Sequence, residues 1–300
     1  MSKSFIARLP LAATALDRDY LNRDSEERIE LVRADPTTRY VVLRDQQALL
    51  ASPTALARLE SPPEGELLVY LGRTLSDGAG LFAVVLPAGA EVEGEWGDLR
   101  SLGTSLDPED AGIFVAALAV TNWHAATAFS PASGSPTRPS KGGWVLLDDA
   151  TGSEHFPRTD MAIIVGVVDE RDRLLLGSNA LWEPNRYSLL AGFVEPGESL
   201  EAAVVREVFE ESGLRVVDPQ YLGSQPWPFP ASLMLGFTAT LDEAAGSELR
   251  PDGVEIVELR WFSREELHAA LGEIRLPGHS SIARAIIEEW YGGPVEEPRP

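Results

Sequence analysis

Three glutamates in the C-terminal half of the chain have the residue type and spacing that metal chemistry requires. Glu207, Glu210 and Glu211 stand at positions i, i+3 and i+4 of a segment with helical character, which places their carboxylates on one helical face. Like charges at this spacing repel each other, and the macrodipole also disfavours them near a helix C-terminus. A bound Mg²⁺ ion would explain the cluster, because this hard cation takes oxygen ligands and acts on substrate phosphates.

The flanking residues predict the helix that carries these carboxylates. Ser199 is a suitable N-cap and Gly213 a suitable helix end, which gives a helix of about four turns. The helix also has an apolar packing surface made of Ala202, Val204, Val205 and Val208. Glutamates on a helix are more often simply solvated, so the spacing alone leaves solvation and metal binding both open.

Composition excludes several classes of protein. The chain has 300 residues, of which 44% are hydrophobic, so it can form two domains with sizeable cores. It has no cysteine, which excludes disulfides, thiolate zinc sites and cysteine nucleophiles. The net charge of −22 disfavours general binding to nucleic acid, although a metal ion could still attract an anionic substrate. There is no apolar run of about 18 residues and no signal-peptide pattern, so we expect a cytoplasmic protein without a membrane span.

Changes of composition predict an α+β protein in three parts with a tail. Residues 1–125 read as a mixed α/β domain, with strands near residues 40–43, 66–71 and 81–86 and a buried helix that starts at Asp107-Pro108. Residues 126–158 read as a linker rich in Pro, Ser and Gly. Residues 159–293 form the second domain, and residues 294–300 read as a disordered tail rich in Pro and Glu. No internal repeat is visible.

The second domain has a clear pattern of strands and helices. Two apolar runs around Asp169–Asp172 predict a hairpin. Further strands are expected at residues 232–241 and 254–262. Ser263 followed by Glu266 is a capping-box signature for a short helix, and residues 281–290 predict a final amphipathic helix.

The segment from Gly192 to Leu214 matches the pattern G-x5-E-x7-R-E-U-x-E-E-x-G-U at every specified position. It therefore resembles the Nudix box, and the resemblance implies an α/β/α sandwich with a mixed sheet that hydrolyses a nucleoside diphosphate linkage. The implied cofactor is Mg²⁺ or Mn²⁺, with Glu207 and Glu211 as ligands and Glu210 as a ligand or as the base that activates water. Gly192 and an ion pair between Glu198 and Arg206 would support the site.

A second motif, Ser-Gln-Pro-Trp-Pro-Phe-Pro-Ala-Ser at residues 224–232, contains three prolines that make a stiff loop. By composition this loop could cover a core or contact a base and a ribose. It resembles the signature of the bacterial NADH pyrophosphatases of the NudC type, and so do residues 122–124, residues 155–158 and the turn at 277–283. The resemblance spans residues 119–291. It implies cleavage of NADH or NAD⁺ to nicotinamide mononucleotide and AMP, removal of NAD caps from RNA, and a homodimer.

The same resemblance implies further site residues. Glu255 would be an additional metal ligand, with Glu258 as its nearest competitor. Phe193 and Phe156 would stack on the substrate base, with Phe156 reaching across the dimer interface, although each could instead be a core residue. The remaining candidate substrate contacts are Gln225, Trp227, Ser232 and Ala283.

The family's small zinc ribbon is degenerate in this sequence. Its four cysteine positions are occupied here by Ser130, Ser133, Asp148 and Thr151. Hydroxyl groups are poor ligands for Zn²⁺, which prefers thiolate or imidazole. We therefore expect no zinc between Phe129 and Arg158, and we expect apolar packing by residues 144–147 to offset its absence.

Two other functions compete with hydrolysis of NADH. The first is a Nudix hydrolase of ADP-ribose or another nucleoside diphosphate derivative, and the proline-tryptophan motif argues against it. The second is a non-catalytic nucleotide- or RNA-binding protein on a Nudix scaffold. The complete set of carboxylates argues against this second alternative, because binding alone does not need it.

Overall fold

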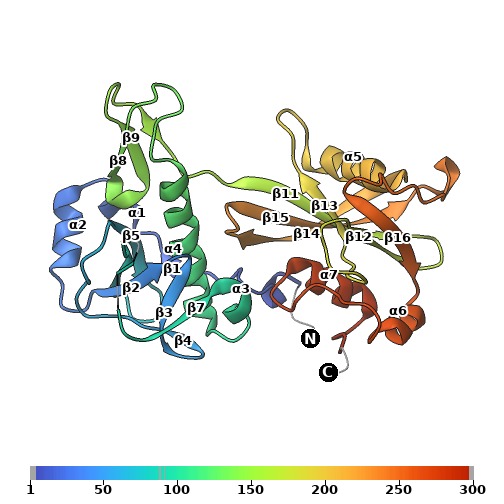
Figure 1. Ribbon diagram of the computed structural model, residues 1–300, viewed down its shortest axis with the longest axis horizontal. Coiled ribbons are helices and arrows are strands. Elements are labelled where there is room, and N and C mark those ends of the chain that lie inside the picture. The colour runs from blue at the N-terminus through green and yellow to red at the C-terminus, as the bar shows by residue number, and fades with distance from the viewer. Residues whose placement is uncertain (1–4, 88, 91, 297–300) are drawn as a thin grey trace. The chain divides into compact units, whose positions relative to one another are not determined.

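The protein divides into two compact units (Figure 1). A computed structural model describes residues 5–87, 89, 90 and 92–296. The N-terminal unit comprises Leu11–Thr159 and Trp227–Ala231, and the C-terminal unit comprises Met1–Pro10, Asp160–Pro226 and Ser232–Pro300. Neither unit is a single stretch of sequence.

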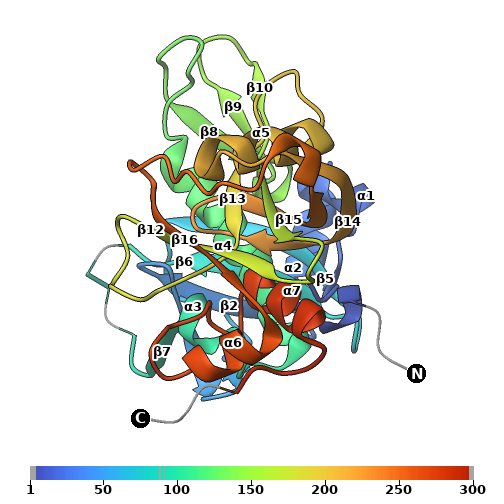
Figure 2. The ribbon, with the colours of Figure 1, turned by 90° about the vertical axis from the view of Figure 1, so that its right-hand side faces the viewer.

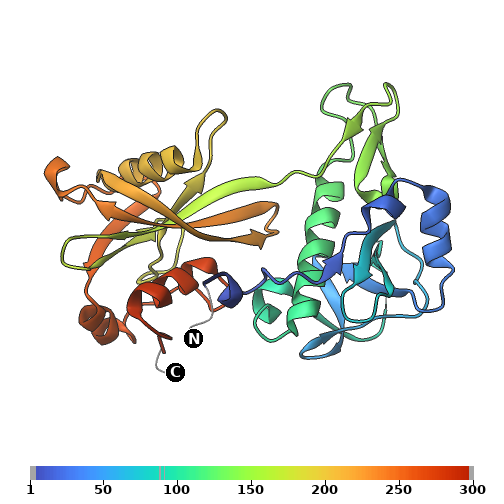
Figure 3. The same cartoon turned by 180° about the vertical axis from the view of Figure 1, so that it is seen from behind.

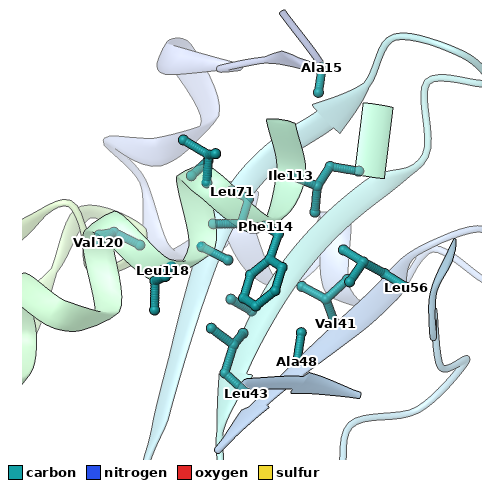
Figure 4. Close-up of a cluster of buried hydrophobic side chains, with 14 of the residues drawn as sticks. Ala15, Val41, Leu43, Ala48, Leu56, Leu71, Ile113, Phe114, Leu118 and Val120 are labelled. Carbon is teal, nitrogen blue, oxygen red and sulfur yellow. The ribbon is translucent and has the colours of Figure 1, made fainter. Parts of the chain in front are cut away.

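A mixed sheet covered by one long apolar helix forms the centre of the N-terminal unit. The strand order is β1-β5-β6-β2-β3-β4, with β7 paired to β3, and β2 runs parallel to β6. Helix α4 (Pro108–Ala126) begins with proline in its first turn and lies along the sheet (Figures 1 and 3). Its Ile113, Phe114 and Leu118 are buried among side chains from the sheet (Figure 4). The strands are β1 (Leu16–Asp17), β2 (Arg39–Arg44), β3 (Gln47–Ser52), β4 (Ala55–Leu56), β5 (Leu67–Thr74), β6 (Gly80–Val85) and β7 (Glu95–Asp98).

Shorter elements complete this unit. Residues 126–158 contain a small antiparallel sheet in the order β10-β9-β8. The elements are α1 (Tyr20–Arg23), α2 (Glu26–Arg33), α3 (Leu99–Leu102), β8 (Thr137–Ser140), η2 (Lys141–Gly143), β9 (Val145–Asp148) and β10 (Glu154–His155).

The C-terminal unit is an α/β/α sandwich with a mixed sheet (Figure 2), which confirms the fold class expected from the resemblance. Helix α5 (Leu200–Ser212) buries Ala203, Val204 and Val208 against one face of the sheet. Helix α7 (Ile282–Tyr291) covers the other face, where Gly166 and Gly236 leave room for its isoleucines. The other elements are η1 (Phe5–Arg8), β11 (Asp160–Val168), β12 (Leu174–Asn179), β13 (Leu190–Phe193), β14 (Val216–Trp227), β15 (Ser232–Leu241), η3 (Glu243–Ala245), β16 (Ile256–Phe262) and α6 (Arg264–Ala270).

The two large sheets follow the same path, although the sequence shows no repeat. In the C-terminal unit the order is β14-β15-β11-β12-β16, with β11 parallel to β15. In the N-terminal unit β5, β6, β2, β3 and β7 take the same order, with β2 parallel to β6. The difference lies between the second and third of these strands along the chain. There the C-terminal unit inserts β13 and α5, whereas the N-terminal unit has only the short β4. The expectation of no repeat is therefore wrong at the level of topology.

Most expected elements of the C-terminal unit are confirmed. The hairpin β11–β12 forms, Ser263 and Glu266 make the capping box, and Ser281 caps α7. The motif at residues 224–232 is not a loop throughout, because β14 continues to Trp227. Among the described residues no helix could cross a membrane, since the long apolar α4 is a core helix.

The predicted disorder of the tail does not hold at Val295. This residue is 1% exposed, and its N–H donates to Glu288 Oε1 at 3.2 Å. Its carbonyl accepts a hydrogen bond from the buried guanidinium of Arg284. Residues 297–300, to which the prediction also applied, lie outside the described residues.

Candidate active site

Helix α5 holds the glutamates in the orientation that its packing dictates. The hydroxyl of Ser199 accepts from the N–H of Ala202 at 3.2 Å, and this bond caps the N-terminus. Gly213 ends the helix at φ 72°, where a glycine avoids the strain that a side chain would bring. Both predicted helix ends are thus confirmed.

Glu207 packs directly against the backbone of β13. A Cβ atom placed on Gly192 would overlap the Glu207 carboxylate, so any larger residue at position 192 would displace it. Only 13% of the Glu207 side chain is exposed. Its burial raises the pKa of this carboxyl group, and the nearby Glu210 and Glu255 act in the same direction, against the opposing effect of Arg206. Gly192 therefore serves the site by its lack of a side chain.

Glu211 is the most deeply buried carboxylate of the group. It is 5% exposed, and its Oε2 has no hydrogen-bond partner. The pKa of Glu211 is raised to about 8, mainly by burial and also by the charges of Glu255 and Glu207, against the opposing effect of a hydrogen bond from the Ala191 backbone. A buried carboxylate without a partner is costly unless it is protonated or a cation approaches it.

Arg206 joins the helix to the loop that precedes it. Its Nε donates to Glu198 Oε2 at 3.1 Å, and its Nη2 donates to the Phe193 carbonyl at 2.9 Å. Its Nη1 lies 2.9 Å from carboxylate oxygens of both Glu207 and Glu210. The pKa of Glu198 is lowered mainly by this guanidinium. The ion pair between Glu198 and Arg206 that the resemblance implies is thus present.

The structure separates the two candidates for a fourth carboxylate. Glu255 immediately precedes β16, and its charge raises the pKa of both Glu211 and Glu207. Glu258 instead accepts a hydrogen bond from the hydroxyl of Tyr187, and burial together with this bond raises the pKa of that phenol. Glu255 therefore belongs with the carboxylates of α5, whereas Glu258 has a structural partner.

The donor set of this site fits a divalent cation. As the side chains stand, no three acidic or histidine residues in the described part of the chain are already gathered as a metal site. However, Glu211 Oε2 is a buried acceptor without a partner, and it lies within the electrostatic reach of Glu207 and Glu255. Carboxylate oxygens are the ligands that Mg²⁺ and Mn²⁺ prefer.

The other predicted contacts fall into two groups. Phe193 ends β13 with 59% of its surface exposed, as a platform for a base requires. Ser232 begins β15, and Ala283 lies buried in the first turn of α7. These three residues remain predicted contacts. Gln225 and Trp227, in contrast, have structural partners.

Gln225 is fully buried and its amide is engaged within the protein. The amide nitrogen donates to the carbonyls of Pro10 at 2.6 Å and Ser280 at 2.9 Å. Its oxygen accepts from the N–H of Ile282 at 2.8 Å. Both ends of the Gln225 amide are thus engaged in this structure, and neither is free for the predicted substrate contact. The side chain instead connects β14 to the start of α7.

Trp227 packs on the core of the N-terminal unit. Its ring meets Phe229 edge to face at 5.0 Å, and Arg100 lies over both rings. Asn122 donates to the Pro228 carbonyl at 3.0 Å and thereby holds the turn. The structure thus gives the tryptophan of this motif packing partners, and its contact with substrate stays a prediction.

Phe156 lies at a cavity of about 450 Å³ within the N-terminal unit. Phe156 and Phe129 are each 63% exposed there. The cavity is also lined by Trp123, His155, Arg158 and Pro230. The sequence pattern indicates Phe156 but not the cavity, because its lining comes from three separate stretches of the chain.

Comparisons with known proteins agree with the geometry. The family described as NUDIX domain matches residues 157–284, and the family described as NADH pyrophosphatase-like rudimentary NUDIX domain matches residues 37–123. The second match accounts for the shared strand order of the two sheets. The C-terminal unit is a Nudix hydrolase domain, a class that generally uses divalent metal ions.

Two curated relatives narrow the class. The chain is 43% identical over 274 residues to the NAD-capped RNA hydrolase NudC of Mycobacterium bovis. This alignment covers 87% of the present chain and 85% of the relative. It is 38% identical over 263 residues to NudC of Stutzerimonas stutzeri, which covers 87% and 90%. A solved NUDIX hydrolase from Nitrosomonas europaea aligns at 25% identity with a TM-score of 0.41 over 55% of this chain and 94% of that one. The chain belongs to the NudC family of Nudix hydrolases.

The buried carboxyl group of Glu211 predicts how the stability of the metal-free protein depends on pH. The unfolded group ionises near pH 4.3, whereas the folded group remains protonated to about pH 8. The unfolded state then binds fewer protons between these values, so stability falls as pH rises through this window. Glu211→Gln cannot ionise and should remove this part of the profile, an effect on the order of 1–3 kcal/mol at pH 8.

Denaturant titrations at pH 5 to 8 in the presence of a chelator measure this effect. Glu201→Gln is the matched control, because Glu201 is exposed in the first turn of the same helix. If Glu211→Gln and Glu201→Gln give the same pH profile, the raised pKa is not a property of the folded protein.

Proposed function

We propose that this protein hydrolyses the diphosphate linkage of NADH and NAD⁺, both as free dinucleotides and as the 5′ cap of RNA. The observation that carries the proposal is the buried Glu211 carboxylate, whose Oε2 has no hydrogen-bond partner, beside Glu207 and Glu255. This site occurs in a chain that is 43% identical to a NAD-capped RNA hydrolase over most of its length. The cation would be Mg²⁺ or Mn²⁺, held by Glu207, Glu211 and Glu255, with Glu210 as a ligand or as the base.

Each residue of the site has a distinct role in this reaction. The bound cation would supply Lewis acidity toward the diphosphate and neutralise charge in the transition state. Arg206 holds the preceding loop through Glu198 and the Phe193 carbonyl, and this fixes the backbone at the end of β13. Glu210 is the carboxylate best placed to accept a proton from water, since 55% of its side chain is exposed. Attack of that water on one phosphorus breaks its bond to the bridging oxygen, which leaves with the other mononucleotide.

The charge of the protein limits how it can bind RNA. With a net charge of −22, the surface as a whole repels the phosphate backbone. A free dinucleotide avoids this repulsion, and a capped RNA would be held through the cap and its first nucleotides. Rates with NADH, ADP-ribose and NAD-capped RNA, measured at several salt concentrations, separate this proposal from an ADP-ribose hydrolase and from a non-catalytic binding protein.

Loss of the Glu211 charge should abolish most of the activity while leaving the fold intact. We expect Glu211→Gln to lower kcat with NADH by at least about a hundredfold, because a neutral amide is a poor ligand for a hard cation. Glu201→Gln, an exposed position of the same helix, should keep nearly normal turnover. Near-normal turnover of Glu211→Gln with metal present would falsify the assignment.

The products should be two mononucleotides. Hydrolysis of the linkage between the two phosphorus atoms converts NADH to AMP and reduced nicotinamide mononucleotide. Chromatography of a complete NADH digest measures this outcome. Release of free nicotinamide together with ADP-ribose would show glycosidic cleavage and exclude the proposed reaction. Hydrolysis in ¹⁸O-labelled water identifies which phosphorus is attacked.

We further propose that the protein is a homodimer in which Phe156 completes the site of the partner subunit. Two exposed phenylalanines beside an aromatic cavity support this arrangement, because dimer interfaces are enriched in such surface. Sedimentation at micromolar concentration should show a dimer, and Phe156→Ala should lower kcat/KM by about tenfold or more.

Mixed dimers of two inactive variants test whether the site is shared. A dimer of Glu211→Gln with Phe156→Ala contains one site with both residues intact only if Phe156 acts across the interface. Mixing should then restore up to about half of the activity of the original dimer. An active monomer, or a mixture no better than its two components, would exclude a shared site.

A further inference from the structure

Residues 129–158 contain two five-residue turns of the same construction. The first turn is Ser130–Gly134 and the second is Asp148–Gly152. In each, the N–H of the fifth residue donates to the carbonyl of the first at 2.8 Å. The fifth residue is a glycine at φ 73° in the first turn and 71° in the second, a backbone region that favours glycine. The two turns start at the first residues of the two pairs that the family resemblance assigns to zinc ligands.

The side chain that opens each turn caps the backbone within it. Ser130 Oγ accepts from the N–H groups of Ala132 at 3.3 Å and Ser133 at 3.4 Å. In the second turn, Asp148 Oδ1 accepts from those of Ala150 at 2.8 Å and Thr151 at 3.1 Å. One side-chain oxygen in each turn therefore accepts hydrogen bonds from two backbone N–H groups of the same turn.

The carboxylate of Asp148 joins the two turns. Its Oδ2 accepts from the hydroxyl of Ser133 at 2.6 Å, and the hydroxyl of Ser130 also donates to this carboxylate. Nε2 of His155 lies 3.1 Å from Ser130 Oγ and extends the network to β10. Asp148 is 1% exposed and Ser130 2% exposed. These hydrogen bonds hold the pKa of Asp148 well below its usual range, so this residue is an ionised carboxylate. We call the Asp148 carboxylate and the hydroxyls of Ser130 and Ser133 that donate to it the hub.

The residues of this cluster do not fit a zinc ion. Thr151, at the fourth family position, donates its hydroxyl to Ser153 Oγ at 2.9 Å, so its side chain makes no hydrogen bond to Asp148. The other donors are two hydroxyls, the single imidazole of His155 and a carboxylate that already accepts several hydrogen bonds, whereas a structural zinc ion takes four ligands that are mainly thiolate or imidazole. In the part of the chain that the structure describes, no group of histidine, aspartate and glutamate here could hold a metal.

The packing of residues 144–147 has a different structural role from the hydrogen bonds of Asp148. Trp144 donates its indole N–H to the Tyr70 carbonyl at 2.7 Å, and Leu146 belongs to the core cluster of the N-terminal unit. These contacts attach the β8–β9 hairpin to the large sheet. They do not join the two turns to each other, and that connection runs through Asp148.

We propose that the buried carboxylate of Asp148 takes the structural place of a metal ion and closes the two turns by hydrogen bonds, so that residues 129–158 fold without zinc. Hydrogen bonds to an ionised acceptor are about twice as strong as neutral ones. A single carboxylate that receives hydroxyl donors from the first turn and backbone donors from the second can therefore replace the cross-link that four thiolates and a metal would provide.

Replacement of the hub residue and of its neighbour tests this proposal. Asp148→Asn keeps the shape but removes the charge, and we expect the melting temperature of the full chain to fall by about 4–8 °C. Asp149→Asn is the matched control, because Asp149 is exposed and only pairs with Arg138 at the surface. Its melting temperature should stay within about 1 °C. Hydrogen exchange at the amides of Ala150 and Thr151 should accelerate in Asp148→Asn alone.

A milder pair of variants covers the case in which Asp148→Asn does not fold. Ser133→Ala removes one hydroxyl from the hub and should lower the melting temperature, whereas Thr151→Ala removes a hydroxyl outside it and should not. Equal behaviour within both pairs of variants would overturn the proposal. So would one zinc per chain in the purified protein that survives a chelator.

A cysteine graft provides the reciprocal test. The variant with Ser130→Cys, Ser133→Cys, Asp148→Cys and Thr151→Cys should bind about one zinc per chain, because the turns already have the same construction. Its melting temperature should then fall on addition of a chelator, while that of the original chain in the same buffer does not change. A graft that folds but binds no zinc would show that the turns do not share the geometry of a metal site.

Discussion

The burial of one carboxylate oxygen without a hydrogen-bond partner is the constraint on which the catalytic unit depends. Glu211 is held there by the packing of α5, whose Ala203, Val204 and Val208 form part of the core. The helix cannot rotate to expose the carboxylate without pulling these side chains out of the sheet. Gly192 and Arg206 then set the positions of the neighbouring carboxylates. The concentration of negative charge lowers the stability of the fold, but it provides the preorganised electrostatics that catalytic sites use.

The two units show which part of this architecture carries the chemistry. Both have the same order of five strands, with one parallel pair in the same place. Only the C-terminal unit inserts β13 and α5, and these two elements supply Gly192, Phe193 and the α5 glutamates. In the N-terminal unit the corresponding connection contains no helix, and α4 supplies the core instead. The sheet is therefore a scaffold that folds with or without a reaction site.

The fold and the catalytic glutamates were largely predictable, because both depend on local patterns. Helix ends follow from Ser199 and Gly213, and the continuous burial in the middle of β11 follows from its apolar run. The roles of Gln225 and Trp227 were not predictable in this way. The partners of Gln225 are Pro10 and Ser280, which are far away in the sequence. A motif shows which residues are special, but only the tertiary contacts show whether a side chain remains free.

The repeated strand order was missed for a related reason. Strand pairing depends on the alternation of apolar and polar residues, which many sequences satisfy, so two sheets can share a path without visible similarity. Asp148 illustrates the opposite case. The sequence showed that the cysteines were absent, but the hydrogen bonds that join the two turns became apparent only from their geometry. The burial of Val295 likewise depends on Arg284, which no local pattern connects to it.

A ribbon closed by oxygen atoms differs from one closed by sulfur in its response to the surroundings. Thiolates that bind a metal are lost when they are oxidised to disulfides or sulfenic acids, and the metal leaves with them. The carboxylate and hydroxyl groups of Asp148, Ser130 and Ser133 have no such chemistry, and the chain has no cysteine elsewhere. The cluster of residues 129–158 is therefore indifferent both to the redox potential of its compartment and to the supply of zinc.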